Sequence, residues 1–445
     1  MTKVVFIVLD GIGDRPIKEK NGKTPLEIAK KPNIDRMTKE GITGISYPVG
    51  PGWVPGSDTG HLALFGYDPF RFYVGRGILE ALGAGIDIKP GEIAFRSNFC
   101  TVEKKGDEWY IIDRRAGRIS NSEAKEISKS ISSIKVKIKD KNGKTREFES
   151  RFYHTKSHRG VLVIRSLDPD FKLNPLISDT DSHHEGRMQW AKPLDESESA
   201  EITSEVLNET IREINRILEK HKLNEERKKK NLKVANSIMT RGASMIEKMQ
   251  RRIEEGAEYS GLYGWAVRVI PFSERYEMKA ACVAGGALYK GVAKYIGMDI
   301  INVPTATADY NTDLEGKINT VINELEKYDF VFLHIKATDI AGHDGDWKMK
   351  VKMIEKIDKA LKPITKLNDT VVVLTGDHST PCNMKSHSAD PVPILIWGPK
   401  EMIRSDDVKR FDEKSTAKGG LGNTTHLNVM PIVMGIIKKA KMYGT

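Results

Sequence analysis

The chain has 445 residues, of which 39% are hydrophobic and 30% charged, which suits a folded protein of two domains. Its net charge of +10 would suit an anionic partner, but the sequence lacks the aromatic–basic pattern or zinc knuckle typical of nucleic-acid binding. No run of about 18 apolar residues predicts a membrane span, and three widely separated cysteines predict reduced thiols. We therefore expect a cytoplasmic protein without nucleic-acid or membrane partners, and interpret the basic run Arg227–Lys230 as a solvated helix face.

The first predicted element is a buried strand over residues 4–9, which ends at Asp10 and Gly11. The middle of the chain differs from it, because strand-like segments alternate there with turns and a long charged helical region follows. These features lie at residues 95–165 (strands and turns), 122–132 (helix), 140–143 (hairpin signal DKNG) and 197–233 (charged helical region).

Two further buried strands are predicted near the C-terminus, at residues 330–335 and 370–375, with a helix at 347–361 between them. Both strands are short β-branched or aromatic runs followed by charged or histidine residues, like the strand at 4–9. This alternation predicts an α/β fold with a mostly parallel sheet covered by helices, in which ligands gather at the carboxyl ends of the strands.

The change in pattern along the chain predicts two domains. We interpret residues 92–275 as a smaller α+β domain inserted into a first domain formed by residues 1–91 and 276–445. The glycine-rich stretches 82–85 and 283–286 flank this insertion and are predicted hinge regions.

Aspartates and histidines follow the predicted strands in a pattern that favours metal binding. Asp339 and His343 are four residues apart, so on a helix they project from one face and can hold one cation. Each residue of the set could instead be a capping aspartate or a core histidine, but together at the strand ends of one sheet they predict a metal site. The set comprises Asp10, Asp339, His343, Asp377, His378 and His387.

Ser57, in the motif PGSDTGHL, is the predicted nucleophile. It stands at the start of a predicted helix, where backbone N–H groups and the helix dipole favour an anion. The alternative is a serine that only caps the helix. Because a serine hydroxyl is a weak nucleophile at neutral pH, the metal site would have to activate it.

These residues belong to a set of motifs that resembles the alkaline phosphatase superfamily, and more narrowly its archaeal type of 2,3-bisphosphoglycerate-independent phosphoglycerate mutase. The motifs run in family order over most of the chain. They are VLDG (8–11), PGSDTGHLALFGYDP (55–69), YVGRG (73–77), RAGRI (115–119), ISDTD (177–181), RGA (241–243), HIKATDIAGHDG (334–345) and TGDHSTP (375–381).

The resemblance implies a phosphatase-like domain with two divalent metal ions and an inserted domain that closes over the substrate. It implies no bisphosphoglycerate cofactor, and manganese is the expected metal, with cobalt, zinc or magnesium as alternatives. Ser57 would take the phosphoryl group of 3-phosphoglycerate and return it to the other hydroxyl. The implied ligands are Asp339, His343 and His387 for one ion, and Asp10, Ser57, Asp377 and His378 for the other.

The resemblance also implies substrate-binding residues. Lys336 would hold phosphoryl oxygens, and His183 would act as acid or base on glycerate, although Ser182 replaces the family's proline and His184 leaves the choice open. The remaining positions are arginines expected to clamp the carboxylate and phosphate, or else to form ordinary salt bridges, and two weaker histidines. They are Arg118, Arg159, Arg241, His154 and His158.

The alternative function is another phosphomutase or a phosphomonoesterase of the same superfamily, which would share Ser57 and the metals. In either case the expected partner is a small phosphorylated substrate. The sequence leaves the oligomeric state open.

Overall fold

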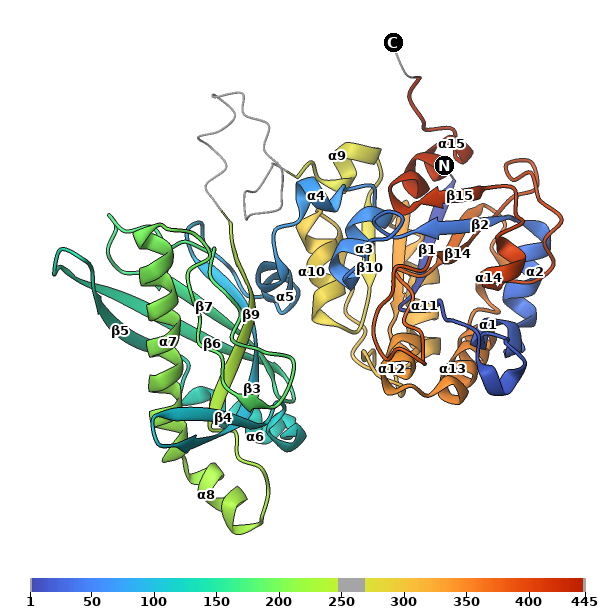
Figure 1. The fold of residues 1–445 in the computed structure, drawn as a ribbon. Helices are drawn as coiled ribbons and strands as arrows, with labels where there is room; N and C mark the ends of the chain where they lie inside the picture. Colours follow the sequence, from blue (N-terminus) through green and yellow to red (C-terminus); the bar gives the residue numbers. More distant parts are fainter. Residues whose placement is uncertain (1, 247–268, 443–445) are drawn as a thin grey trace. The chain divides into compact units, whose positions relative to one another are not determined.

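The computed structural model of the protein describes residues 2–246 and 269–442 (Figure 1). The chain forms two compact units, one from residues 1–73 and 269–445 and one from residues 74–268. The second unit thus begins earlier than the insertion predicted at 92, because helix α5 (Arg76–Gly83) packs against its sheet. Gly77 lies directly against the backbone of Ala94, and a side chain there would collide with it.

The first unit contains an eight-stranded sheet with the order β11-β10-β12-β1-β13-β14-β2-β15. Its central strands run parallel and match the three predicted strands, which are confirmed: β1 (Lys3–Leu9), β12 (Phe330–Ile335) and β13 (Thr370–Thr375). The other strands are β2 (Ile42–Tyr47), β10 (Ala280–Val283), β11 (Asp299–Ile300), β14 (Val392–Trp397) and β15 (Gly422–Thr425).

Strand register brings the functional segments together at one edge of this sheet. Val8 of β1 lies opposite His334 of β12 on one side and Thr375 of β13 on the other. Asp10, Lys336 and Asp377 each lie two residues after one of these three positions, just beyond the end of their strand. Parallel pairing in this register therefore places three residues from distant parts of the sequence side by side.

Helices cover both faces of this sheet. Val5 and Ile7 face one core, which is closed by helices α2 (Pro32–Glu40), α11 (Leu314–Glu324) and α13 (Trp347–Ala360). Phe6 faces the other side, where its ring packs against Phe65 at the end of α3 (Ser57–Leu64). The remaining α-helices are α1 (Pro25–Ile28), α4 (Pro69–Phe72), α9 (Phe272–Tyr276), α10 (Ala287–Tyr295), α12 (Ala337–Asp344), α14 (Glu413–Thr416) and α15 (Val429–Ile436).

The second unit contains an antiparallel sheet with the order β5-β6-β7-β3-β4-β8, and β9 pairs with β3. The predicted hairpin DKNG connects β5 to β6 and is confirmed. The strands are β3 (Ile93–Lys105), β4 (Glu108–Asp113), β5 (Ile134–Lys139), β6 (Thr145–Lys156), β7 (Arg159–Ser166), β8 (Gly186–Arg187) and β9 (Ser237–Met245).

The helices of the second unit differ in part from the prediction. Helix α6 (Asn121–Lys129) matches the expected segment, but the charged region at 197–233 forms two helices, α7 (Glu198–Glu219) and α8 (Lys222–Lys229). The break occurs because His221 caps α8 by accepting a hydrogen bond from the Leu223 backbone N–H.

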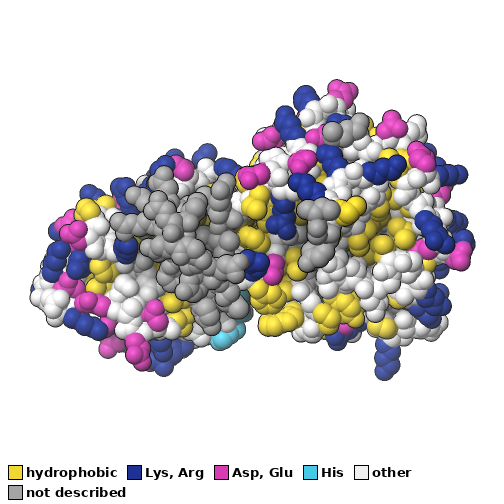
Figure 2. Space-filling view, turned by 90° about the horizontal axis from the view of Figure 1, so that it is seen from above, with side chains coloured by type: hydrophobic (Ala, Val, Ile, Leu, Met, Phe, Trp, Pro, Cys, Tyr) yellow, Lys and Arg dark blue, Asp and Glu magenta, His cyan; other side chains and the backbone are white. Residues whose placement is uncertain are grey.

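The basic run was misinterpreted at its first residue. Arg227 is only 5% exposed and donates to the Lys233 carbonyl, the Ala116 carbonyl and Glu123. The three lysines that follow are exposed as predicted. On the face in Figure 2, described basic side chains are interspersed with acidic ones. Among the helices described, none is long and apolar enough to span a membrane.

Candidate active site

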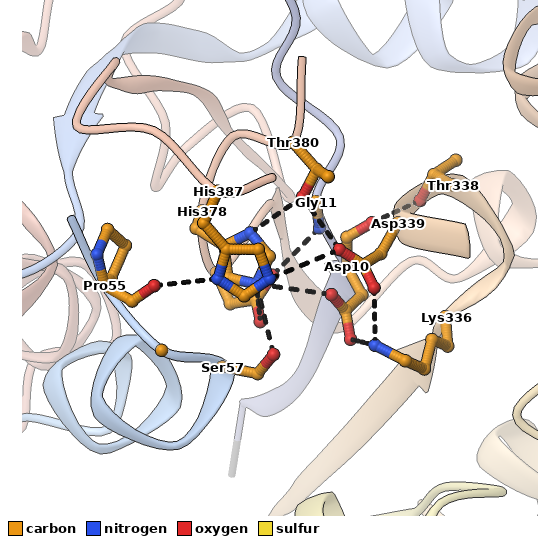
Figure 3. Close-up of polar contacts among 12 residues, drawn as sticks. Asp10, Gly11, Pro55, Ser57, Lys336, Thr338, Asp339, His378, Thr380 and His387 are labelled. Carbon is orange, nitrogen blue, oxygen red and sulfur yellow. Dashed lines mark hydrogen bonds and ion pairs between the residues drawn. The ribbon is translucent and has the colours of Figure 1, made fainter. Parts of the chain in front are cut away.

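Two groups of carboxylates and imidazoles lie at the carboxyl edge of the first unit's sheet (Figure 3). One group consists of Asp10, Asp377 and His378, and the other of Asp339, His378 and His387. Within each group the ligand atoms lie within 4.8 Å of one another. All three residues of the first group are buried. In the second group Asp339 and His378 are buried and His387 is partly exposed.

Asp10 and Asp377 offer oxygen atoms that no described residue satisfies. Asp10 Oδ2 accepts from His334 and Lys336, but Asp10 Oδ1 accepts no hydrogen bond within the described residues. Asp377 Oδ1 accepts from the Gly11 backbone N–H at 3.0 Å, whereas its Oδ2 accepts no hydrogen bond from the described residues, although His61 Nδ1 and His378 Nε2 each lie 3.3 Å from it. A buried carboxylate oxygen without a donor is costly, and a bound cation would relieve that cost.

Asp339 is positioned by α12 and by a hydroxyl from the loop after β13. Lys336 Nζ lies 2.7 Å from Asp339 Oδ2, and Thr380 Oγ1 donates to Asp339 Oδ1 at 2.7 Å. His343 and His387 approach that same oxygen at 3.4 and 3.7 Å through Nε2. His387 is oriented by its Nδ1, which lies 2.8 Å from the Pro55 carbonyl oxygen, so that Nε2 faces Asp339.

The charges of these residues fit divalent metal ions. Three buried carboxylates converge, and within the described residues Lys336 is the one lysine or arginine that pairs with them. Burial raises the pKa of Asp339, but Lys336 together with His378 and His343 lowers this pKa to about 2. Burial lowers the pKa of His378, which keeps its ring neutral. The carboxylates and imidazole are therefore in the protonation states that bind cations.

Ser57 is the first residue of α3 and lies beside the first group. Its Oγ is 3.1 Å from His378 Nε2, and the residue is only 4% exposed. Gly56, not Ser57, is the N-cap, since the Gly56 backbone N–H donates to Thr59 Oγ1. The Ser57 hydroxyl is therefore not used for capping and faces the candidate metal ligands.

The predicted ligands come together, with two features that the sequence did not indicate. His378 belongs to both groups of three, whereas His343 belongs to neither and its side chain is 42% exposed. The two groups adjoin each other, because the His378 and His387 rings stack at 3.7 Å, and the division of the ligands between two ions stays a prediction.

Several contributors were missed because their roles depend on contacts between distant segments. His334 lies in β12 and is 3.0 Å from Asp10 Oδ2, while its ring stacks on Tyr289. His61, one turn after Ser57, places Nδ1 2.6 Å from the Ser57 carbonyl and 3.3 Å from Asp377. Both histidines lie inside the motifs quoted above. Their short separation in sequence from Ser57 and from Asp339 was the one signal that could have indicated a role at the site.

The second unit holds a cluster of arginines around Glu80. Burial raises the pKa of Glu80, but Arg96 and then three further arginines lower it below its ordinary value. Arg96 lies directly opposite Arg241 in the pairing of β3 with β9, and Nε of each lacks a hydrogen-bond partner among the described residues. Like charges directly opposite destabilise a sheet, so this arrangement favours an anion between them. The arginines that lower the Glu80 pKa are Arg76, Arg96, Arg159 and Arg241.

The structure therefore places two of the three predicted arginines, Arg159 and Arg241, in one cluster and adds Arg76 and Arg96 to it. Arg118 ends a short 3₁₀ helix and is exposed; burial lowers the pKa of His158 to about 3, and Arg159 and, more weakly, Arg118 add to this shift. His183 is exposed in a left-handed backbone conformation, with φ of 62°, and its N–H donates to Asp181. His184 is exposed, and His154 Nε2 lies 2.9 Å from the Ser157 carbonyl oxygen.

Comparison with known proteins agrees with this site. The model of the metalloenzyme superfamily matches residues 2–435. The 2,3-bisphosphoglycerate-independent phosphoglycerate mutase of Methanococcus aeolicus is 43% identical, over 99% of this chain and 100% of its own. The mutase 1 of Methanocaldococcus jannaschii is 42% identical, over 99% of both chains.

Two solved structures resemble the whole chain. A protein from Pyrococcus horikoshii has a TM-score of 0.78 at 34% identity, covering 100% of this chain and 99% of its own. The cofactor-independent phosphoglycerate mutase from Thermoplasma acidophilum has a TM-score of 0.63 at 34% identity, covering 98% of this chain and all of its own, 100%.

Proposed function

The chain belongs to the family of 2,3-bisphosphoglycerate-independent phosphoglycerate mutases, within the metalloenzyme superfamily, and we propose that it interconverts 3-phosphoglycerate and 2-phosphoglycerate as an isomerase. The observation that carries the proposal is the buried Ser57 hydroxyl, 3.1 Å from His378 and beside two carboxylate–imidazole groups. The cytoplasmic location expected from the sequence stays a prediction, which fractionation of cells would test.

We propose two divalent ions, with manganese as the expected metal and cobalt, zinc or magnesium as alternatives. Bound there, they would supply positive charge that favours the Ser57 alkoxide and neutralises the phosphoryl oxygens. The residues that would hold them are Asp10, Ser57, Asp339, His343, Asp377, His378 and His387.

The proposed reaction has two matched transfers. Ser57 Oγ loses its proton and forms a bond to phosphorus as the bond from phosphorus to the substrate's 3-oxygen breaks, and that oxygen gains a proton; Ser57 regains a proton in the second transfer. The 2-hydroxyl then loses a proton and attacks phosphorus, which releases Ser57 and gives 2-phosphoglycerate. Lys336, which lies 3.1 Å from Asp10 and 2.7 Å from Asp339, would keep these carboxylates in place and add positive charge near the phosphoryl group.

The second unit would supply the groups that bind glycerate. We propose that Arg96, Arg159 and Arg241 bind the carboxylate, because four arginines gather around the single carboxylate of Glu80 and arginine matches planar anions. Arg118 is a further, weaker contributor. His183 would move the proton to and from the glycerate hydroxyls, and its exposure leaves both ring nitrogens accessible to substrate.

Substitution of Ser57→Ala tests the proposal. Mutase activity in a coupled assay without bisphosphoglycerate should fall by a factor on the order of 10⁴, because the chain would lose its nucleophile. Labelled phosphoglycerate should phosphorylate the wild-type chain but not this variant. As a matched control, Thr59→Ala removes a hydroxyl from the same helical turn and should retain activity within about tenfold of wild type, since it costs only a cap of about 1 kcal/mol.

Two outcomes would contradict the proposal. Substantial mutase activity in the Ser57→Ala variant would exclude the serine as nucleophile. Release of inorganic phosphate from phosphoglycerate by the wild type, without formation of 2-phosphoglycerate, would favour the alternative of a phosphomonoesterase.

A further inference from the structure

Lys350 is a buried lysine that the proposed reaction does not use. It lies in α13 and is 0% exposed. Its ammonium group donates to the Gly13 carbonyl at 3.0 Å, to Asp14 Oδ2 at 2.8 Å and to the Thr380 carbonyl at 3.0 Å. All three N–H groups are therefore used, with one carboxylate to balance the charge.

The three acceptors belong to the two loops that carry candidate metal ligands. Gly13 and Asp14 follow Asp10 in the loop after β1, and Thr380 follows His378 in the loop after β13. The loops also bond directly to each other, since the Thr380 N–H donates to the Gly13 carbonyl at 3.1 Å. The Cys382 N–H adds a bond to Asp14 Oδ1 at 3.1 Å. Lys350 thus sits at the junction where both loops meet α13.

Thr380 connects this junction to the ligands themselves. Its carbonyl is held by Lys350, and its Oγ1 lies 2.7 Å from Asp339 Oδ1 and 3.2 Å from His378 Nδ1. Asp339 and His378 belong to the same candidate group of ligands. A shift of the Thr380 backbone would therefore move a hydroxyl that orients two ligands at once.

We propose that Lys350 is a positioning residue of the metal centre, which fixes the two ligand-bearing loops relative to each other without touching metal or substrate. This inference rests on the proposed assignment of Asp10, Asp339 and His378 as metal ligands. Residues beyond the ligands commonly set the orientation of the ligands, and their loss typically costs about 10–100-fold in metal affinity or activity.

The alternative is a buried ion pair that only stabilises the fold, and Lys31 offers a matched control for it. Lys31 is a second buried lysine of the same unit, 1% exposed, and donates to the Leu26 carbonyl at 2.7 Å. It also lies 3.5 Å from Asp35, so it resembles Lys350 in having a carbonyl and a carboxylate partner. Neither of these partners lies in the loops that follow β1 and β13.

The test measures Mn²⁺ binding to the full-length, metal-depleted protein by the electron paramagnetic resonance signal of free Mn²⁺. We expect Lys350→Met to weaken Mn²⁺ binding about 10–100-fold and to lower kcat with little change in KM. Lys31→Met should leave the Mn²⁺ affinity within about twofold of wild type, while its thermal unfolding reports the cost of losing a buried lysine. Asp339→Asn, which alters a proposed ligand, should weaken binding at least as much as Lys350→Met.

The outcomes separate the inference from the function on which it rests. Wild-type Mn²⁺ affinity in Lys350→Met, with weak binding in Asp339→Asn, would overturn the role of Lys350 and leave the metal centre intact. Equal weakening in Lys31→Met would also overturn it, because the effect would then follow stability alone. Unchanged Mn²⁺ affinity in Asp339→Asn would instead contradict the proposed metal centre.

A double variant covers the case in which Lys350→Met does not fold. Lys350→Met combined with Asp14→Asn removes both charges, so that no unpaired carboxylate remains buried. The double variant should fold and still bind Mn²⁺ about 10–100-fold more weakly than wild type, because the link between the loops is gone. Wild-type affinity in the folded double variant would overturn the inference.

Discussion

In the first unit one ammonium, that of Lys336, pairs with two of the three buried carboxylates, Asp10 and Asp339, whereas in the second unit four arginines gather around one carboxylate, Glu80. The two clusters are thus unbalanced in opposite directions. They are also built differently: parallel strands deliver Asp10 and Asp377 to one edge, whereas antiparallel pairing sets Arg96 opposite Arg241. We propose that a ligand neutralises the excess charge of each cluster, divalent metal in the first unit and an anion in the second.

Removal of metal should affect the first cluster most strongly and leave the second unchanged. After dialysis against a chelator, mutase activity should fall by a factor on the order of 10³ or more, because metal charge is worth several kcal/mol to such a reaction. The melting temperature should fall as well, because a metal ion present at 100 times its Kd stabilises the folded protein by about 2.7 kcal/mol. Mn²⁺ should restore both. Full activity in protein shown by elemental analysis to be metal-free would show that the reaction does not need metal at the first cluster.

Substitution of Arg96→Met should affect the second cluster alone. Loss of one charge-assisted hydrogen bond of about 1.5–3 kcal/mol should raise KM for phosphoglycerate about 10–100-fold, with Mn²⁺ affinity unchanged. Without substrate the stability of the variant should change little, because the repulsion between Arg96 and Arg241 is removed together with the attraction between Arg96 and Glu80.

Arg165→Met is the matched control for Arg96. Arg165 lies in β7 of the same unit and pairs with Glu149 at 2.6 Å, with 45% of its side chain exposed. Its substitution should leave KM within about twofold of wild type, since exposed salt bridges contribute at most about 1 kcal/mol. A normal KM in Arg96→Met, or an equal rise in Arg165→Met, would show that the cluster around Glu80 does not bind substrate.

Mild acid should act gradually, lowering the stability of the first unit through its buried histidines. Burial lowers the pKa of His426 to about 3 and that of His334 to about 4. Both rings stay neutral in the folded chain while the unfolded chain binds protons below about pH 6.5, so stability is lost as the pH falls from there toward 4. Each ring contributes a slope of up to about 1.4 kcal/mol per pH unit.

Denaturant unfolding of the metal-free protein between pH 7 and pH 4.5 measures this slope. His426→Gln should make the slope shallower, because one proton-binding group of the unfolded chain is lost. His184→Gln, at an exposed position, should leave it unchanged. A slope that is the same in His426→Gln as in wild type would mean that this buried ring does not contribute to the acid sensitivity.

The strands and several site residues could be predicted because short-range patterns encode them. Buried runs at 4–9, 330–335 and 370–375 follow from β-branched and aromatic composition, and the hairpin at 140–143 from its turn residues. The early start of the second unit could not be predicted, because α5 is assigned to it by close packing of Gly77 on Ala94.

Residues that act through neighbours far away in sequence were not predicted either. Thr380, His334 and Lys350 are an ordinary threonine, a strand histidine and a helix lysine until the fold places them against Asp339, Asp10 and Gly13. Arg227 illustrates the opposite error. Its basic run predicts a solvated helix face, but tertiary contacts bury this first residue of the run.

The sequence by itself therefore determined the chemistry of this protein: which strands end in carboxylates and histidines, that a serine precedes a helix, and the family to which the motifs belong. Only the tertiary structure decided how that chemistry is held in place. The parallel register aligns Asp10, Lys336 and Asp377, antiparallel pairing sets Arg96 opposite Arg241, and Lys350 joins two loops. The physical reason is that side-chain type and local periodicity are written along the chain, whereas burial, charge balance and hydrogen-bond partners arise between segments hundreds of residues apart.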